Sequence, residues 1–198
     1  TDPKAQGISA GVHRIETKVP ARVAIEQLLD PKRLVDQVVV REGTNLNDVI
    51  KLLKKSKNID AAGFTNKSLQ LISSIFPELS KSLEGALYPA HYSFAPGTPL
   101  VSALEQMVAK AKSVASSTGL DMGYEGYNAF EVLTIASMVQ VEGDPTNFDK
   151  VARVIYNRLK IGMPLQLNAT VQYAGNNRGE ILVTNKEVQI NSPYNTYK

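Results

Sequence analysis

The sequence lacks cysteine entirely, and it contains only two histidines, His13 and His91, among its 198 residues. Without cysteine, disulfides, zinc sites built from thiolates and cysteine nucleophiles are excluded. With so few histidines, a metal site that needs several imidazoles is not expected either. We therefore expect neither a metal nor a cofactor, whereas the missing cysteine fits an export compartment as well as the cytosol.

Long apolar runs and a strong charge of one sign are also missing. No uncharged apolar run reaches 18 residues, the length at which a membrane-spanning helix is suspected. The net charge is +3, and the whole surplus lies within residues 1–60. Such an excess is too small to indicate nucleic acid binding, although it suits a weak attraction to an anionic polymer. The content of 43% apolar and 21% charged residues is typical of a globular protein.

Short strands and helices alternate at the start of the chain, and longer helices follow. Alternating or β-branched residues predict the strands, and apolar residues at helical spacing predict the helices. The expected elements are strands over 11–18 and 38–40 and helices over 20–29, 45–57, 66–76 and 98–116. These elements predict an α+β fold, with a small N-terminal α/β region followed by a mainly helical region that has short strands.

A capping box and an apolar stripe predict a helix from Asn128 to Glu142. Glu131 stands three residues after Asn128, which is the spacing of a capping box. The stripe follows at helical offsets in Val132, Ile135, Ala136 and Val139. The next position of the stripe is Glu142, so its carboxylate is expected on the apolar face, at the end of the helix and just before Gly143.

Glu142 is therefore the candidate catalytic residue. Burial and the negative end of the helix dipole both disfavour a carboxylate anion, and a carboxyl group that keeps its proton near neutral pH can act as a general acid. The alternative is a solvated glutamate at a fraying helix end. Spacing alone favours this alternative, because such environments are only probabilistic markers of function.

A second helix, expected over 147–161, follows Glu142 after a short link. A link this short predicts an antiparallel hairpin of two helices. The hairpin would bring Asn157 or Arg158 near Glu142. The sequence thus predicts that one of these two polar residues lies near the Glu142 carboxylate.

Two later segments are rich in polar and aromatic side chains. Residues 163–170, which end at Thr170, are expected to be extended, and residues 192–197 follow near the end of the chain. Both segments combine amides and hydroxyls, and the second adds tyrosines. Rings that stack and amides that bind hydroxyls suit sugar recognition, although each of these residues alone is more often a turn or a half-buried core group.

Several short motifs occur in a fixed order from about residue 11 to the end of the chain. They are 38–43 (VVVREG), 83–92 (LEGALYPAHY), 136–142 (ASMVQVE), 151–159 (VARVIYNRL), 162–166 (GMPLQ) and 194–197 (YNTY). Together, and at this spacing, the motifs resemble the endolytic murein transglycosylases of the MltG (YceG-like) family.

The resemblance implies an enzyme that cleaves the MurNAc–GlcNAc bond within nascent peptidoglycan strands and leaves a 1,6-anhydro end. Glu142 falls on the catalytic glutamate of the family and would act first as an acid and then as a base. Because the C6 hydroxyl of the sugar closes on C1 in place of water, one carboxyl group suffices. The candidate substrate-binding residues are Gln166, Tyr194 and Asn195, which match positions that line the family's cleft, together with Thr170, Asn157 and Tyr88.

The resemblance also implies a domain organisation and a location. Residues 1–60 would be a LysM-like remnant and a connector, and residues 61–198 would be the YceG-like catalytic region, with Gly63 near the boundary. Family members begin with a single-pass membrane anchor and continue beyond the YNTY motif. We therefore expect the full-length protein at the extracytoplasmic face of the bacterial membrane. The expected partners are peptidoglycan strands, peptidoglycan synthases and division proteins, and not nucleic acid.

Some positions depart from the family pattern. Gln140 stands where many members have a second glutamate, which makes Glu142 the indispensable acid, and Asn168-Ala169 and His91 are local substitutions. Two other functions stay open: a glycan-binding or scaffold module without catalysis, and a helical module that binds division proteins. An ordinary glycosidase would need a second carboxylate, roughly 5–9.5 Å from the first, and the sequence leaves Asp144 and Asp149 as candidates.

Overall fold

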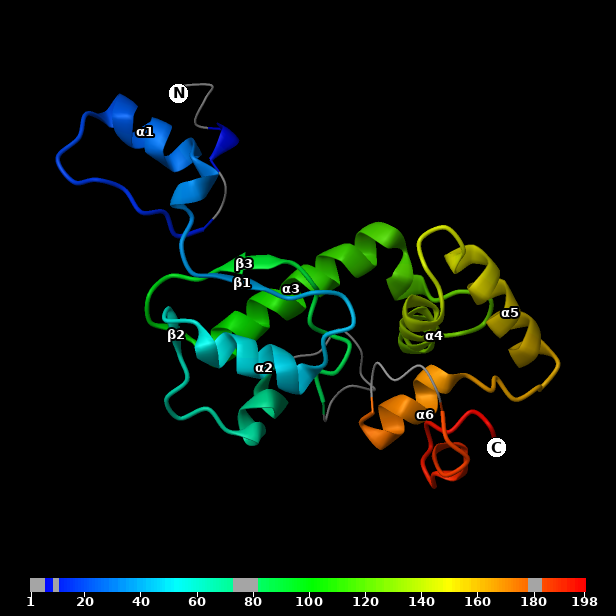
Figure 1. Ribbon diagram of the computed structural model, residues 1–198. Coiled ribbons are helices and arrows are strands. Elements are labelled where there is room, and N and C mark those ends of the chain that lie inside the picture. The colour runs from blue at the N-terminus through cyan, green and yellow to red at the C-terminus, as the bar shows by residue number, and fades with distance from the viewer. Residues whose placement is uncertain (1–5, 9–10, 73–81, 178–182) are drawn as a thin grey trace. The chain divides into compact units, whose positions relative to one another are not determined.

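The computed structural model describes residues 6–8, 11–72, 82–177 and 183–198. The chain forms two compact units, Thr1–Thr118 and Gly119–Lys198, and each is described by itself. Both units are mainly helical, and the described strands are short and lie in the first unit (Figure 1). The predicted α+β class is therefore confirmed. In the described residues, no helix combines the length and the apolar character that a membrane crossing requires.

The bounds of the elements follow the chain order. The α-helices are α1 (Ala21–Leu29), α2 (Leu46–Lys55), α3 (Leu100–Thr118), α4 (Ala129–Glu142), α5 (Phe148–Lys160) and α6 (Asn168–Gly175). The strands are β1 (Gln37–Val39), β2 (Ile59–Asp60), β3 (His91–Ser93) and β4 (Thr98–Pro99). Short 3-10 helices occupy Pro31–Arg33, Asn66–Leu71, Leu120–Met122 and Glu187–Gln189. Part of the helix expected over 66–76 lies outside the described residues.

Two pairs of short strands connect distant parts of the first unit. Strand β1 pairs antiparallel with β3, and β2 pairs parallel with β4. Both pairs join residues before 61 to residues after 90, so the boundary expected between residues 60 and 61 lies inside this unit, and the contacts divide the chain after Thr118 instead. The apolar side chains buried most deeply here come from α2, α3 and the segments between them: Val49, Leu53, Leu83, Phe94, Leu100, Leu104 and Met107.

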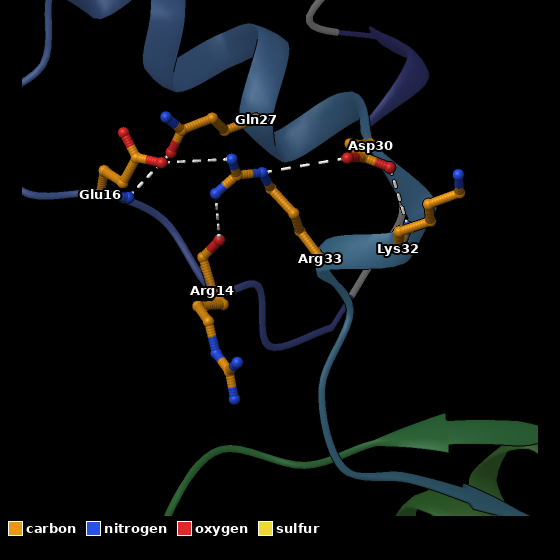
Figure 2. A network of polar contacts seen from close by, with 6 residues as sticks. All are labelled: Arg14, Glu16, Gln27, Asp30, Lys32 and Arg33. Atoms are coloured by element: carbon orange, nitrogen blue, oxygen red, sulfur yellow. Dashed lines mark hydrogen bonds and ion pairs between the residues drawn. The ribbon is translucent and has the colours of Figure 1, made fainter.

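Polar contacts hold the N-terminal segment against α1 and the turn that follows it (Figure 2). The strand predicted over 11–18 is wrong, because within the described residues this segment makes only one isolated bridge. The N–H of Glu16 donates instead to Oε1 of the buried Gln27 at 2.8 Å. Arg33 donates to the carbonyl of Arg14 at 3.2 Å and to the Glu16 carboxylate at 3.4 Å. These side-chain bonds add to two main-chain bonds beside the bridge, from Arg14 N–H to the Arg33 carbonyl and from Val35 N–H to the Val12 carbonyl.

The second unit is built on the hairpin of α4 and α5, with α6 packed against α4. The predicted capping box of α4 is confirmed: Asn128 Oδ1 accepts the N–H of Glu131 at 2.9 Å, and the Glu131 carboxylate accepts the N–H of Asn128 at 2.8 Å. The core of this unit is one apolar cluster of Ile135, Val139, Ile155 and Leu165. This cluster joins α4 to α5 and to the segment that leads into α6, and it fixes where the end of α4 lies.

Candidate active site

Glu142 is the last residue of α4, and it is exposed. The predicted burial of its carboxylate is wrong, and so is the inward position of Ala136, which is also exposed. The buried residues of α4 are Ile135 and Val139, and residues 140–142 lie beyond them in contact with solvent. The chemistry of this carboxyl group therefore has to be argued from its neighbours and not from burial.

The Glu142 carboxylate accepts a hydrogen bond from a main-chain N–H of α6. The N–H of Ala169 donates to Glu142 Oε1 at 3.0 Å. Residues 163–170 were expected to be extended, but α6 begins at Asn168, so that Ala169 stands in its first turn. The N-terminal end of α6 favours an anion and the C-terminal end of α4 disfavours one, so the two helix ends act on the carboxylate in opposite directions.

The C-terminal segment of the chain holds the start of α6. The carbonyl of Thr196 accepts the N–H of Gln166 at 2.9 Å, and its hydroxyl accepts the N–H of Leu167 at 3.0 Å. The hydroxyl of Thr170, a buried residue, lies 2.9 Å from the Thr196 hydroxyl. Two predicted substrate-binding residues, Gln166 and Thr170, are thus brought to the same helix end as Glu142.

A further contact joins the last residues to α6. The hydroxyl of Tyr197 donates to the side-chain oxygen of Asn168. Asn168 and Gln166 are both exposed, so their side chains can meet a ligand that approaches this end of α6. The site therefore presents the carboxylate of Glu142 together with the exposed amides of Gln166 and Asn168.

Tyr194 and Asn195 belong to the same segment but differ in their surroundings. Tyr194 is 54% exposed, and its ring meets that of Tyr173 edge to face, with 5.0 Å between the ring centroids. This geometry leaves the Tyr194 ring available for stacking. Asn195 is buried, and its amide donates to the carbonyls of Val188 and Ile190 at 3.0 and 2.9 Å. These contacts occupy both amide hydrogens, so Asn195 holds the segment together.

The other predicted neighbours lie elsewhere. Asn157 is exposed on α5, while Arg158 donates to the carbonyl of Leu165 and so fixes the chain between α5 and α6. Tyr88 belongs to the first unit, where its carbonyl accepts the hydroxyl of Tyr92 at 2.6 Å. The structure therefore groups Gln166 and Thr170 around α6 together with Glu142, and it places Tyr88 in the other unit.

Asp144 was one candidate for a second carboxylate, and it is engaged in its own loop. The hydroxyl and N–H of Thr146 donate to Oδ1 at 2.5 and 2.8 Å, and the amide of Asn147 donates to Oδ2 at 2.8 Å. The Thr146 hydroxyl foremost, with these other bonds, lowers the pKa of Asp144. The loop thus links α4 to α5 as a closed turn. Asp149 is exposed in the first turn of α5.

Sequence reasoning missed two groups of this site. The N–H of Ala169 carries no sequence signal, since every residue except proline has one. Thr196 lies inside a motif that the sequence analysis singled out, but its neighbours Tyr194 and Asn195 were chosen instead. Across the part of the chain that the structure describes, no group of three or more histidine, aspartate or glutamate side chains could hold a metal ion.

Comparison with known proteins assigns the family. A family model described as the YceG-like family matches residues 1–198. A curated relative from Bacillus subtilis (strain 168), named endolytic murein transglycosylase, is 30% identical over 213 residues, which cover 98% of this chain and 59% of the relative. A relative of the same name from Streptococcus pneumoniae (strain D39) is 38% identical over 121 residues, which cover 59% of this chain and 22% of the relative.

The fold has a match among solved structures. A crystal structure of a YceG-like protein from Listeria monocytogenes matches with a TM-score of 0.65, over 98% of this chain and 70% of that chain. At 24% identity, this likeness concerns the fold alone. The chain spans 59% of the length of the Bacillus relative. Because the family model matches the chain from residue 1 to residue 198, the chain belongs to the YceG-like family.

Proposed function

We propose that this chain carries the catalytic part of a peptidoglycan transglycosylase that cuts MurNAc–GlcNAc bonds within glycan strands. Its membership of the YceG-like family supports this function, as do the two relatives named endolytic murein transglycosylase. The activity belongs to a longer protein, since the chain spans 59% of the Bacillus relative. The proposal therefore assigns to this chain only the catalytic part of that protein, the part that contains Glu142.

The observation that carries the proposal is the exposed carboxylate of Glu142, held by the N–H of Ala169 at 3.0 Å. A buried carboxyl group could not reach the middle of a polymer strand, whereas an exposed one can. The exposed amides of Gln166 and Asn168 are suited to binding sugar hydroxyls, and the Tyr194 ring is suited to stacking on a pyranose face. These residues are the substrate-binding part of the proposal.

The proposed reaction needs one carboxyl group, which acts first in its protonated form and then as a carboxylate. Glu142, protonated, gives its proton to the glycosidic oxygen, and the bond from C1 of MurNAc to that oxygen breaks. The C6 hydroxyl oxygen then bonds to C1 and returns its proton to the Glu142 carboxylate, which restores the starting form. Water does not take part, and the products are a free GlcNAc hydroxyl and a 1,6-anhydro end. Because Ala169 occupies Oε1, we assign both proton transfers to Oε2.

The test is digestion of purified peptidoglycan sacculi with the chain and with its Glu142→Gln variant. Glutamine keeps an oxygen that accepts the Ala169 N–H but cannot transfer a proton as an acid. We expect 1,6-anhydro products with the unchanged chain and their loss, by about 100-fold or more, in the variant. Glu131→Gln is the matched control, because it makes the same change on the same helix and retains the capping box. Products with reducing ends and no anhydro sugar would indicate a hydrolase instead.

A scaffold module without catalysis is the second candidate, and one observation favours it. Glu142 Oε1 accepts the N–H of Ala169 in the first turn of α6, so the carboxylate also serves as a structural cap. A scaffold predicts that the chain binds glycan strands, that Glu142→Gln binds them equally well, and that neither releases a product. The same digestion, with a sedimentation assay for bound chain, separates the two candidates.

The location and partners follow from this proposed activity. Peptidoglycan lies outside the cytoplasmic membrane, so we propose that the full-length protein acts at the extracytoplasmic face, held there by a single-pass anchor. Partners among the peptidoglycan synthases and division proteins would supply nascent strands at that face. Cross-linking of the full-length protein in growing cells tests this part, and recovery of cytoplasmic proteins alone would contradict it.

A further inference from the structure

We propose that Thr196 is a positioning residue for Glu142: it fixes the first turn of α6, whose Ala169 N–H binds the carboxylate. This inference rests on the catalytic role proposed above for Glu142. The Thr196 hydroxyl contacts Leu167 and Thr170, which precede it by 29 and 26 positions in the sequence. The Ala169–Glu142 bond spans 27 positions.

A ring of three hydrogen bonds joins Thr196 to the start of α6. A hydroxyl has one hydrogen to donate, and Thr170 uses its own on the carbonyl of Leu167 at 2.8 Å. In the 2.9 Å contact between the two threonine hydroxyls, Thr196 is therefore the donor. The N–H of Leu167 donates to the Thr196 hydroxyl at 3.0 Å. The ring begins at the N–H of Leu167 and ends at its carbonyl, so Thr196 ties together the two peptide units on either side of the Leu167 α-carbon.

Leu167 is the N-cap residue, directly before α6, and its apolar side chain makes no capping bond. At most helix starts, a serine, threonine, aspartate or asparagine at this position would accept an N–H of the first turn. In this chain the carboxylate of Glu142, which belongs to α4, accepts one N–H of that first turn, the N–H of Ala169. The direction in which Ala169 N–H points thus depends on how Leu167 is held, and Thr196 holds it.

The backbone of Gln166 is independent evidence that residues outside α6 hold its first turn in place. Its φ is 52°, a left-handed conformation that strains every residue except glycine. Such a conformation persists where its surroundings enforce it, and it gathers at functional sites. The N–H of Gln166 donates to the carbonyl of Thr196 at 2.9 Å. One residue, Thr196, therefore holds two consecutive residues directly before α6.

The first test is independent of enzymatic activity. In the ¹⁵N-labelled chain, the amide signal of Ala169 is followed by NMR as pH crosses the titration of Glu142. We expect the signal to titrate in the unchanged chain and in Thr196→Ser, which keeps the hydroxyl. We expect the titration to be absent in Glu142→Gln and to be lost in Thr196→Val, which removes the hydroxyl but keeps the shape. An unchanged Ala169 titration in Thr196→Val would overturn the proposal.

The second test measures turnover of peptidoglycan. A displaced carboxylate affects the chemical step, so Thr196→Val is expected to lower kcat by about 10- to 100-fold and to leave KM within about twofold. Thr196→Ser should restore most of kcat. Thr134→Val is the control, because the exposed Thr134 hydroxyl on α4 makes only a local bond to the carbonyl of Phe130 among the contacts described. An equal loss in Thr196→Ser and Thr196→Val would contradict the positioning role.

The two tests separate this inference from the proposed function. If the Ala169 titration responds to Thr196→Val but no variant releases product, the proposed function fails and the positioning of Glu142 stands. If Thr196→Val does not fold, Thr170→Val breaks the same ring from its other side and is expected to abolish the same titration. Failure of both variants to fold would assign the ring to stability alone and would overturn the proposal.

Discussion

At the scale of single residues, the backbone of Gln166 shows how this site is held. Its left-handed conformation places an exposed amide side chain two residues before Asn168, the first residue of α6. A residue with a β-carbon is strained there, and glycine is not. The conformation and the side chain of Gln166 can therefore be separated by mutation, because glycine relieves the strain and alanine does not.

We expect Gln166→Gly to leave the free energy of unfolding unchanged or to raise it by up to about 1 kcal/mol, because glycine relieves the left-handed strain but gains freedom in the unfolded chain. Gln166→Ala keeps the strain and should be the less stable of the two. Both variants lose the amide, so both should raise KM for peptidoglycan by the same factor. Urea unfolding and initial rates measure the two effects. A glycine variant that is less stable than the alanine variant would refute this account.

Glu142 shows what the sequence could and could not predict at this scale. The helical spacing places Glu142 three residues after the buried Val139, but the carboxylate expected on that buried face is exposed. Its exposure depends on where the packing of α5 and Leu165 against α4 ends, and a single helix does not encode that limit. The capping partner, a main-chain N–H 27 residues later, has no side-chain signature at all.

At the scale of elements, a helix start can be predicted from the sequence where its capping side chain lies close by in the chain. Helix α2 starts at Asn45, whose side chain accepts the N–H of Asp48 at 2.9 Å, and α4 starts at the Asn128 capping box. Both starts were predicted from the sequence, because the donor and the acceptor lie three residues apart. Helix α6 was not predicted, since the bonds that hold its start come from Thr196.

We expect Asn128→Ala to lower the free energy of unfolding by about 1 kcal/mol, because it removes the side chain that accepts the N–H of Glu131. Asn128→Asp keeps a capping oxygen and should lose much less. Helix α4 carries Glu142 at its other end, so kcat at a temperature where the variant is folded should change little. Thermal unfolding followed by circular dichroism gives the first quantity. Equal stability of the alanine variant and the unchanged chain would show that the box contributes nothing.

At the scale of the whole molecule, the chain divides after Thr118 and not near residue 60. The polar stretch around Gly63 resembles a linker in composition, but the strand pairs join the chain across it. Such pairings are long-range, and local composition does not report them. All the contacts described for Glu142 and α6 lie within the second unit, so a change confined to the first unit should leave them intact.

Asp36 offers such a change with a predictable dependence on pH. Its carboxylate accepts the Ser56 hydroxyl and the N–H of Asn58, and the Ser56 bond foremost lowers the pKa of Asp36 below 3.8. A lowered pKa in the folded state contributes stability above pH 3.8 that is lost as pH falls through the folded-state pKa. Asp36→Asn tolerates the same positive φ and should therefore be less stable near neutral pH, with the difference vanishing in acid.

Thermal unfolding of both chains between about pH 2 and pH 7 measures that difference. Amide hydrogen exchange then assigns it to a unit, because local opening follows cooperative units of the fold. We expect faster exchange in α2 near neutral pH and no change at Ala169. A stability difference that grows as pH falls would have the wrong sign for this carboxylate. Faster exchange at Ala169 would contradict the expectation that the effect stays within the first unit.

The order in which the site is assembled follows from the ring around Leu167. The hairpin of α4 and α5 is local in sequence, whereas the ring requires a loop of 29 residues to close. On the ribosome, the hairpin can form while later codons are still being read, whereas the Glu142 carboxylate gains the hydrogen-bonded orientation described here only after Thr196 has emerged.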